Sequence, residues 1–522
     1  MTTSLLHRYI SLVIAALFCG TALAQKKAPK ELYVPMDYST CGYHASEARI
    51  PDVKVAAYVA WHEGDCSARL QQAIDYVSTL KPDAGGCRGA VLIGEGTFRL
   101  DQPLRLHTPG VVLRGTGRDK TTLVKYGSDR GAVIWGQGGS RGQGARGKGQ
   151  ENSEAIGKVI SCSMPPAPNP KEKTAASPQE LTVEGLQLQK GDRVRIVRPS
   201  TKEWIESLRM YDFGGGLDYT GWKPTDIDIT WDRTVVAVEG NRVTLDAPLT
   251  CTLCEGTTIE RYQPAGELTE CGIENMTIEA AVNDWNPKDE DHAWDGITMD
   301  QARDCWVRRV CFRHLAGAAV NLQKNTSRIT VEDCIAMEPV SEVGGWRRCV
   351  YLTRGQQTLF QRCISRQGIH DFAAGYCAAG PNAFVQCEGE ESLGFSGSIG
   401  SWACGLLFDI VNIDGSDLRY ANLEEYQFGT GWNTANSMFW QCTASTIQCY
   451  SPDSDNRNSA HGCWGTLVGN GEWTESNNHV QPRSLFYDQL AKRLNSQFTI
   501  HNSQLTIFRS KTSTTRQHSS AT

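Results

Sequence analysis

The sequence predicts an all-β fold, a right-handed parallel β-helix in which the chain winds as a solenoid. Two observations lead to this prediction. Short segments with apolar or small residues at alternate positions recur through the C-terminal half about every 24 residues. A second short apolar stretch precedes each segment, and a polar turn separates the two. Strands that always run in the same direction are expected to pair in parallel, as stacked coils.

One position of the recurring segment forms a column of similar residues: Met276, Val310, Cys334, Cys363, Cys387, Val411 and Cys442. In stacked coils this column becomes an interior ladder. A thiol fits there because it behaves as a small, buriable hydrophobe. We therefore expect Cys334, Cys363 and Cys387 to be stacked thiols rather than disulfide bridges. The second set of strands is expected at 296–300, 319–323, 349–354 and 376–379.

The N-terminus has the pattern of a secretory signal peptide, predicted over residues 1–24. Arg8 supplies a positive charge, a short apolar run follows, and Ala22-Leu23-Ala24 matches the cleavage pattern of small residues. The mature protein is expected to be secreted, periplasmic or on the cell surface. No other segment has the roughly 18 apolar residues that a membrane span needs.

The mature chain is predicted to form one β-helix domain over residues 25–508. Residues 67–80 have the apolar face of an amphipathic helix, which is expected to cap the open N-terminal end of the solenoid. Residues from about 155 to 262 break the repeat and predict a small β insertion. This insertion either packs against the solenoid or forms one wall of a substrate cleft. The Ser/Thr-rich tail, 509–522, is expected to be disordered. Short strands are expected after the capping helix at 90–93, 97–100, 104–106 and 111–114.

Motifs near the N-terminus resemble those of the pectate lyase-like right-handed parallel β-helix superfamily. They are Asp65, Leu70, Gln71, Ala73, Ile74 and Asp75, then Gly96-Thr97-Phe98 and Leu113-Arg114-Gly115-Thr116-Gly117. The resemblance covers about residues 65 to 450, and the segment from Arg366 to Phe372 looks like that of exported bacterial lyase-like or glycoside hydrolase-like proteins. Since the superfamily includes lyases, hydrolases, epimerases and phage tailspikes, the resemblance implies the fold and leaves the reaction open. The Asn-Thr-Asp and Gly-His-Gly motifs of polygalacturonases are missing.

The longest excursions leave the solenoid at the same corner, so they are expected to line one groove. They are 281–294, 339–348, 368–372, 392–402 and 416–433. Their tryptophans could stack on sugar rings, or could simply pack their own loops. The predicted substrate-binding tryptophans are Trp294, Trp346, Trp402 and Trp432.

Arginines near the same corner predict an anionic sugar. Arginine grips a uronate carboxylate in bidentate fashion, and this neutralisation acidifies the C5 proton that β-elimination removes. We assign Arg348 and Arg366 to catalysis and Arg347 and Arg354 to substrate binding. The alternative is a set of surface salt bridges with Glu338, Glu342, Glu390 and Glu391. The net charge of −6 argues against a nucleic-acid partner, which would need a basic face, and a monomer is expected.

His370 and Asp371 are the predicted catalytic pair. Histidine can act as a general base near neutral pH, and an adjacent carboxylate could stabilise its charged form. Tyr420 or Tyr426 could donate a proton to the leaving oxygen. Calcium is the one cofactor considered, with Asp291 and Asp295 as ligands, although this acidic loop could equally be solvated.

The sequence therefore predicts a secreted polysaccharide lyase acting by β-elimination on a uronic-acid-containing glycan. One alternative is a glycoside hydrolase that uses two carboxylates at a suitable separation. Its candidates are Asp295, Asp371, Glu390 and Glu391. The other alternative is a β-helix that binds glycans without cleaving them.

Overall fold

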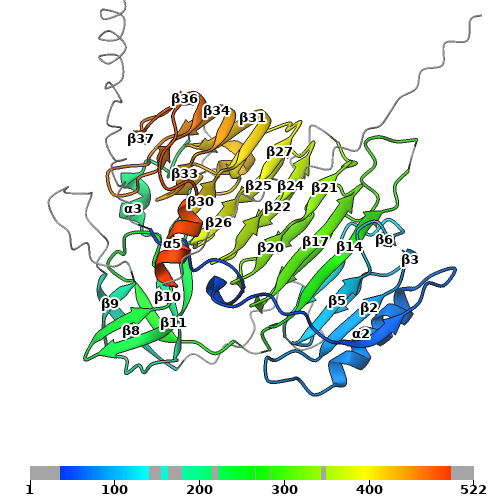
Figure 1. Cartoon of the computed structure of the whole chain (residues 1–522). Coiled ribbons are helices and arrows are strands. Elements are labelled where there is room, and N and C mark those ends of the chain that lie inside the picture. The colour runs from blue at the N-terminus through cyan, green and yellow to red at the C-terminus, as the bar shows by residue number, and fades with distance from the viewer. Residues whose placement is uncertain are drawn as a thin grey trace, which may run out of the picture.

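The computed structural model describes residues 36–139, 154–162, 179–213, 221–264, 266–283, 285–342 and 348–494. Parallel strands stack coil upon coil into one continuous 27-stranded sheet, which confirms the predicted all-β parallel β-helix (Figure 1). The predicted signal peptide and C-terminal tail lie outside the described residues, so both stay predictions. Among the described residues, no helix is long and apolar enough to span a membrane.

Each coil has three strands rather than the two expected, and stacking gives three strips of parallel sheet. The first strip contains β1 (Val55–Val59), β2 (Gly89–Ile93), β5 (Val111–Gly115), β14 (Gly272–Ala280), β17 (Trp306–Arg313), β20 (Thr330–Glu332), β23 (Leu359–Gln361), β26 (Asn382–Val385), β30 (Leu406–Asp409), β33 (Met438–Trp440), β35 (Ser459–His461) and β37 (Glu472–Thr474). The second contains β3 (Gly96–Leu100), β6 (Thr121–Lys125), the second halves of β14 and β17, β21 (Ile335–Met337), β24 (Ile364–Arg366), β27 (Glu388–Glu390) and the first parts of β31 (Asn412–Tyr420), β34 (Thr443–Cys449) and β36 (Trp464–Val468). The third contains β4 (Leu104–Leu106), β7 (Ala132–Gln137), β15 (Asp295–Asp300), β18 (Val320–Leu322), β22 (Cys349–Thr353), β25 (His370–Ala374), β28 (Ser396–Ser398) and the last parts of β31, β34 and β36.

The extra strand arises because the repeated segment bends in its middle at a residue with positive φ. The bend recurs at one position of seven successive coils, with φ between 50° and 59°, at Asn275, Arg309, Asp333, Arg362, Gln386, Ile410 and Gln441. Only Asn and Asp among these types favour the left-handed region, so residue type gave no consistent signal of the bend.

The predicted interior column is confirmed. Met276 pairs with Val310 across neighbouring coils. Backbone hydrogen bonds place the three cysteines on neighbouring coils. The N–H of Ile364, next to Cys363, donates to the Cys334 carbonyl at 2.9 Å, and the N–H of Glu388, next to Cys387, donates to the Cys363 carbonyl at 3.0 Å. Cys334, Cys363 and Cys387 are buried free thiols, as predicted.

Three of the four predicted second strands are observed, as β15, β18 and β22, and the fourth is wrong. The strand expected at 376–379 lies instead at His370–Ala374, as β25. The connection after β24 is short in this coil, so the chain re-enters the third strip at once and Gly375–Ala379 forms the following turn. His370 and Asp371 therefore belong to a strand and not to a loop.

Helices cover one end and one side of the solenoid. The predicted cap is present as α2 (Ser67–Thr79), which buries Leu70, Ile74 and Val77 in the same core as the coils (Figure 1). On the outer side of the first strip, α5 (Leu485–Arg493) packs with Met36 to Cys41 over apolar side chains that include Leu407 and Trp440.

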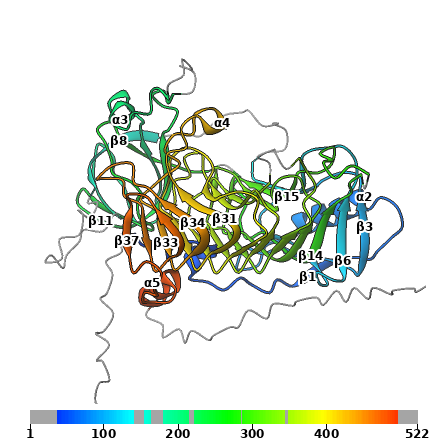
Figure 2. The ribbon, with the colours of Figure 1, turned by 90° about the horizontal axis from the view of Figure 1, so that it is seen from above.

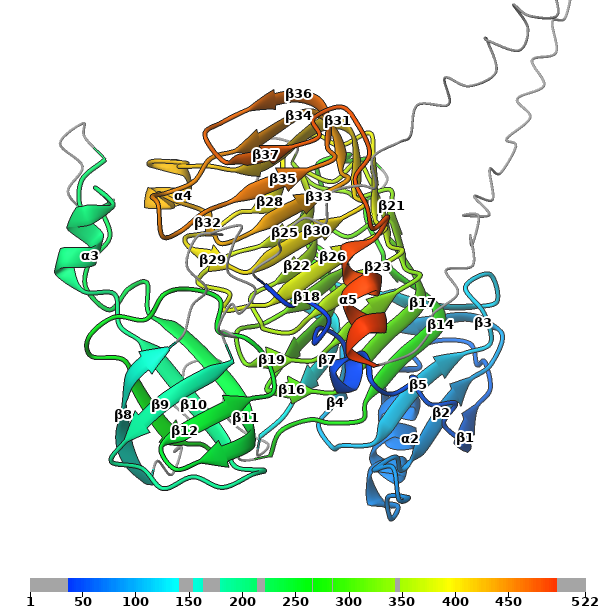
Figure 3. The same ribbon diagram turned by 60° about the vertical axis from the view of Figure 1, so that its left-hand side comes forward.

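The predicted β insertion is a closed antiparallel barrel placed between β7 and β14 (Figure 3). Its strands are β8 (Glu154–Cys162), β9 (Glu180–Glu184), β10 (Arg193–Arg198), β11 (Ile229–Glu239), β12 (Arg242–Leu245) and β13 (Thr258–Arg261), and it also carries the short helix α3 (Lys202–Ser207). Arg233 of β11 is fully buried and donates to the Gln356 side chain at 2.6 Å and the Gly380 carbonyl at 2.9 Å. Both acceptors belong to the β-helix, so the barrel is docked against the corner that follows the third strip, beside the C-terminal coils (Figure 2).

Candidate functional site

The outer face of the third strip carries the polar cluster best suited to chemistry. Ile297, Val320 and Leu322 of this strip lie in the interior core. The residues between them face away from the core and pair along the strip, as Thr298 with Asn321 and Asn321 with Leu352.

Arg354, immediately after β22, is held on this face by an aromatic ring. Its guanidinium carbon lies 4.2 Å from the ring centroid of Tyr376. The Tyr376 hydroxyl donates to the side-chain oxygen of Gln427 at 3.2 Å. In the part of the chain that the structure describes, the buried Nε of Arg354 has no hydrogen-bond partner, and no ion pair of Arg354 is observed. A positioned guanidinium without a counter-ion can bind an anion.

His370, at the start of β25, is oriented by two hydrogen bonds. Its Nδ1 lies 2.7 Å from the Phe395 carbonyl oxygen, which can only accept, so Nδ1 carries the proton. Nε2 is then an acceptor, and the Tyr426 hydroxyl donates to it at 3.1 Å. His370 is 1% exposed, and burial lowers the pKa of its imidazole to about 4. The ring is therefore neutral at physiological pH.

Tyr426 reaches His370 from a hairpin that spans residues 422–432 and contains the short helix α4 (Tyr426–Gly429). Its ring lies 6.0 Å from that of Phe395, and partial burial raises the pKa of its hydroxyl. Since Gln427 is the next residue, the hairpin connects the Arg354–Tyr376 pair with the His370–Tyr426 pair. We call Arg354, His370, Tyr376, Tyr426 and Gln427 the arginine–tyrosine cluster.

The predicted pairing of His370 with Asp371 is wrong. Asp371 is fully buried and accepts a hydrogen bond from the Ser365 hydroxyl, inside the solenoid. Neighbouring residues of a strand face opposite sides, so the two side chains contact different groups. Burial raises the pKa of the Asp371 carboxyl to about 6, but this carboxyl cannot orient the imidazole.

The two arginines assigned to catalysis have structural partners. Arg366 lies on the second strip, and its Nε donates to Glu390 at 2.7 Å, so the salt-bridge alternative is the correct one. Arg348 is buried and donates to the Ser341 hydroxyl at 2.7 Å and the Ser341 carbonyl at 2.9 Å. Neither arginine joins the arginine–tyrosine cluster, whereas Arg354, assigned to binding, is part of it.

Two of the predicted tryptophans lie side by side: the backbone N–H of Trp402 donates to the Trp432 carbonyl at 2.9 Å. Trp402 is 0% exposed and packs against Trp204 and Trp222, with ring centroids 4.8 and 5.9 Å away, so it cannot stack on a sugar. Trp294 donates to the Glu290 carbonyl at 3.0 Å and packs against Arg130. Trp432 lines a surface hollow. Trp346 and Arg347 lie outside the described residues.

The two predicted calcium ligands are not brought together. Asp291 pairs with Arg130 at 2.6 Å. Asp295 instead accepts hydrogen bonds from the Asn321 side chain at 2.8 Å and the Ala318 N–H at 2.9 Å. Elsewhere in the described ranges, one group has the spacing of metal ligands: His44, Glu270 and Asp304. Asp304 forms an ion pair with Arg328, and His44 bonds to Glu270 at 2.7 Å, so this group is already charge-balanced.

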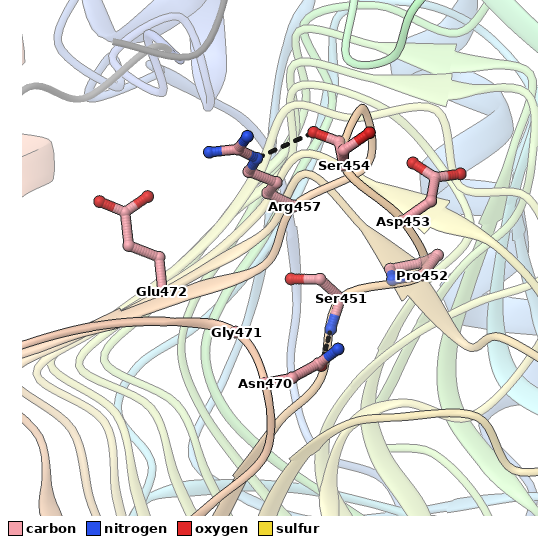
Figure 4. Close-up of a pocket in the computed structure, with 8 residues that line it drawn as sticks. All are labelled: Ser451, Pro452, Asp453, Ser454, Arg457, Asn470, Gly471 and Glu472. Carbon is pink, nitrogen blue, oxygen red and sulfur yellow. Dashed lines mark hydrogen bonds between the residues drawn. The ribbon is translucent and has the colours of Figure 1, made fainter.

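Two hollows lie near the C-terminal coils. One, of about 400 Å³, lies between the barrel and the Tyr426 hairpin and is lined in part by Trp432. The other, of about 530 Å³, is lined by Ser451, Pro452, Asp453, Ser454, Arg457, Asn470, Gly471 and Glu472 (Figure 4). Pro452 borders both, so the two hollows are neighbours.

A family described as "Domain of unknown function (DUF6298)" matches residues 471–522. No curated protein matches the chain. Among solved structures, the chain is similar to a polygalacturonase from Erwinia carotovora, at 11% identity and a TM-score of 0.36, over 84% of this chain and 96% of that one. It is also similar to an alginate lyase from Paenibacillus sp. str. FPU-7, at 8% identity and a TM-score of 0.35, over 81% of this chain and 100% of that one. The surface adhesin PfbA of Streptococcus pneumoniae gives 9% identity and a TM-score of 0.36, over 81% and 78%. The chain's own three strips of stacked parallel strands form the β-helix that its sequence motifs implied.

Proposed function

We propose that the protein is a polysaccharide lyase that cleaves a uronic-acid-containing glycan by β-elimination at the arginine–tyrosine cluster. The observation that carries the proposal is the placement of Arg354. It is fixed over Tyr376, its buried Nε has no partner among the described residues, and it is connected through Tyr376 and Gln427 to the hairpin that carries Tyr426. An anionic group is the natural ligand of such a guanidinium.

Arg354 would bind the carboxylate of the sugar at the cleavage site. Two parallel N–H donors neutralise the carboxylate and stabilise the charge that develops on it when the C5 proton leaves. This stabilisation is the requirement that distinguishes elimination from hydrolysis. A stacked arginine also loses little side-chain entropy on binding, because Tyr376 already fixes its plane.

Tyr426 and His370 would move the protons. As the Tyr426 oxygen takes the C5 proton, its own proton passes to Nε2 of His370, which is neutral and 3.1 Å away. The C5–H electrons form the C4–C5 double bond, and the bond from C4 to the leaving oxygen breaks. Tyr426 then protonates the leaving oxygen, and His370 returns the proton to Tyr426.

The hydrolase alternative has less support because its candidate carboxylates are scattered. Asp371 is inside the solenoid, Glu390 pairs with Arg366 on the second strip, and Asp295 is on the third. Asp300 is the other carboxylate of β15, but a strand spaces Asp295 and Asp300 by about 16 Å, beyond the range of a glycosidase pair. We also propose that the protein acts outside the cytoplasm, because residues 1–24 have the pattern of a signal peptide.

Incubation of the purified chain with a panel of uronate polysaccharides tests the proposal. We expect the ultraviolet absorbance of an unsaturated uronate to appear together with new reducing ends. New reducing ends without that absorbance would establish a hydrolase, and binding without either product would establish a glycan-binding protein. Either of these results would overturn the proposed reaction.

A further inference from the structure

The hollow between α3 and the Tyr426 hairpin is a second feature of the molecule that can bind a ligand. The barrel contributes Arg209, Asp212 and Phe213 to its lining, and the hairpin contributes Asn422, Glu424 and Trp432. We call it the α3 hollow. Its volume of about 400 Å³ is within the range of small-molecule sites.

The α3 hollow and the arginine–tyrosine cluster share the hairpin 422–432. The hairpin is closed by two backbone hydrogen bonds, from Leu423 to the Gly431 carbonyl at 2.8 Å and from Gly431 to the Glu424 carbonyl at 2.9 Å. Tyr426 lies at its tip, in α4, whereas Glu424 and Trp432 line the hollow from its two arms. A glycan bound at Tyr426 therefore has the α3 hollow beside it.

The two walls of the hollow are held together by direct contacts. Gly431 has φ of 59°, and a Cβ there would lie 2.6 Å from the Met210 sulfur, so the barrel approaches the hairpin backbone closely. Nε1 of Trp222 donates to the Gly429 carbonyl at 3.2 Å and fastens the two parts together. Beneath them Trp222 stacks on Trp204, with centroids 5.8 Å apart. A preformed wall lowers the entropy cost of binding.

The lining suits an uncharged, hydroxyl-rich ring. Phe213 and Trp432 are partly exposed aromatic surfaces, and polar groups surround them. Among the described residues of the lining are two carboxylates, Asp212 and Glu424, and one guanidinium, Arg209. Hydroxyl groups can donate to carboxylates and accept from arginine, whereas a uronate carboxylate would be repelled.

We infer that the α3 hollow binds a neutral pyranose of the same polysaccharide whose uronate binds at Arg354. The inference rests on the proposed function, which it deepens: the substrate is a heteropolymer of uronic acid and neutral sugar. The neighbouring hollow has the same balance, since Asp453 and Glu472 lie around Arg457 (Figure 4). A chain of neutral sugars can thus continue from the α3 hollow, past Pro452, into this neighbouring hollow.

Calorimetry with neutral hexasaccharides tests the inference without requiring cleavage. The probes are cellohexaose, mannohexaose, maltohexaose and xylohexaose, each titrated into the full chain. We expect at least one to bind, and its affinity to fall at least tenfold in Trp432→Ala. If none binds, or if Trp432→Ala leaves the affinity within twofold, the inference is overturned.

Glu424→Arg is the second variant, because Glu424 is exposed and its replacement leaves the aromatic packing intact. It replaces a carboxylate of the lining with a second guanidinium beside Arg209, so we expect weaker binding of the neutral probe and at least fivefold tighter binding of hexagalacturonate. Unchanged affinities for both probes would overturn the inference even if Trp432→Ala fails to fold. Failure of the lyase assay alone would overturn the proposed function and leave these binding results standing.

Discussion

Nε2 of His370 lies 3.1 Å from the hydroxyl oxygen of Tyr426, although 56 positions separate the two residues along the chain. Strand β25 supplies the histidine and the hairpin 422–432 supplies the tyrosine. The carbonyl of Phe395 fixes the imidazole tautomer, so the lone pair of Nε2 faces the hydroxyl. The proposed proton transfers depend on this hydrogen bond.

Tyr426→Phe removes the hydroxyl and keeps the ring that packs near Phe395. We expect kcat to fall at least 100-fold, the scale of a lost general acid–base group, with KM little changed. Initial rates of unsaturated product measure the effect. Tyr76→Phe is the matched control, because Tyr76 is exposed on α2 at the opposite end of the chain's fold. A Tyr426→Phe enzyme with more than a tenth of the normal kcat would remove Tyr426 from the mechanism.

Arg354→Ala and Arg366→Ala form a second matched pair. Both arginines lie outside the solenoid core, but Arg366 bonds to Glu390 at 2.7 Å, whereas Arg354 stacks on Tyr376. We expect Arg354→Ala to lower kcat/KM by about 30- to 150-fold, equivalent to the roughly 2–3 kcal/mol of a charged hydrogen-bonding group. Arg366→Ala should stay within threefold, since an exposed ion pair contributes little. If Arg366→Ala lowers kcat/KM more than Arg354→Ala does, the uronate binds at Arg366 on the second strip and not at Arg354.

The fold could be predicted in detail because its signals are local. Alternation along each strand and the repeat of about 24 residues placed the interior column correctly, and the apolar face of residues 67–80 placed the capping helix. The three-strand coil could not be predicted, because its bend falls on residues as different as Arg309, Asp333 and Ile410. The strand at 376–379 was misplaced because the length of a connection is set by the tertiary fold.

The site was harder to predict because its members meet only through docking of separate segments. Asp371 looked like the partner of His370 because it is adjacent in sequence, but its carboxyl is buried and bonds to the Ser365 hydroxyl. For Arg366 the sequence left a salt bridge open as the alternative, and the repeat could have decided for it: Glu390 follows Arg366 by 24 positions, so the two occupy the same place on neighbouring coils and pair. The position of Tyr426 depends on contacts with the barrel, which the repeat cannot reveal.

The buried imidazole of His370 makes stability depend on pH. Its pKa is about 4 in the folded protein and 6.5 unfolded, so between these values the unfolded state holds more protons. The contribution of the neutral imidazole to the free energy of unfolding is fully present above pH 6.5. As the pH falls towards 4, at most about 3 kcal/mol of this contribution is lost. We expect the difference in free energy of unfolding between the wild-type protein and His370→Gln to shrink by up to this amount from pH 7 to pH 4. Urea unfolding at each pH measures this difference. A difference that does not vary with pH would contradict the assignment of His370 as neutral in the folded protein.

Asp409 should give the opposite pH dependence. Its carboxyl is fully buried and accepts from the Ser484 hydroxyl at 2.6 Å and the Phe486 N–H at 2.8 Å, at the start of α5. Burial raises its pKa from 3.8 to about 7, so the folded state holds the extra proton. The normal chain loses stability as the pH rises from 4 through 7, by at most about 4 kcal/mol. Asp409→Asn keeps an acceptor and does not titrate, so we expect it to be more stable than the normal chain at pH 8 and similar at pH 4. Equal stabilities at both pH values would show that Asp409 is solvated.

Arg233 tests whether the docked barrel supports the site. The fully buried guanidinium donates to Gln356 and to the carbonyls of Gly380 and Pro248, and burial lowers its pKa to about 10, so it remains charged at neutral pH. Arg233→Met leaves those acceptors without donors, and we expect a loss of about 3–5 kcal/mol in stability.

Because the barrel carries α3 and the hairpin 422–432 rests on it, undocking should also displace Tyr426. We therefore expect Arg233→Met to expose the barrel to limited proteolysis and to lower kcat, although Arg233 does not touch the arginine–tyrosine cluster. Arg242→Ala, at an exposed arginine of the same barrel, should do neither. If Arg233→Met undocks the barrel but retains full activity, the hairpin is held by the β-helix alone, and the barrel has no part in placing Tyr426.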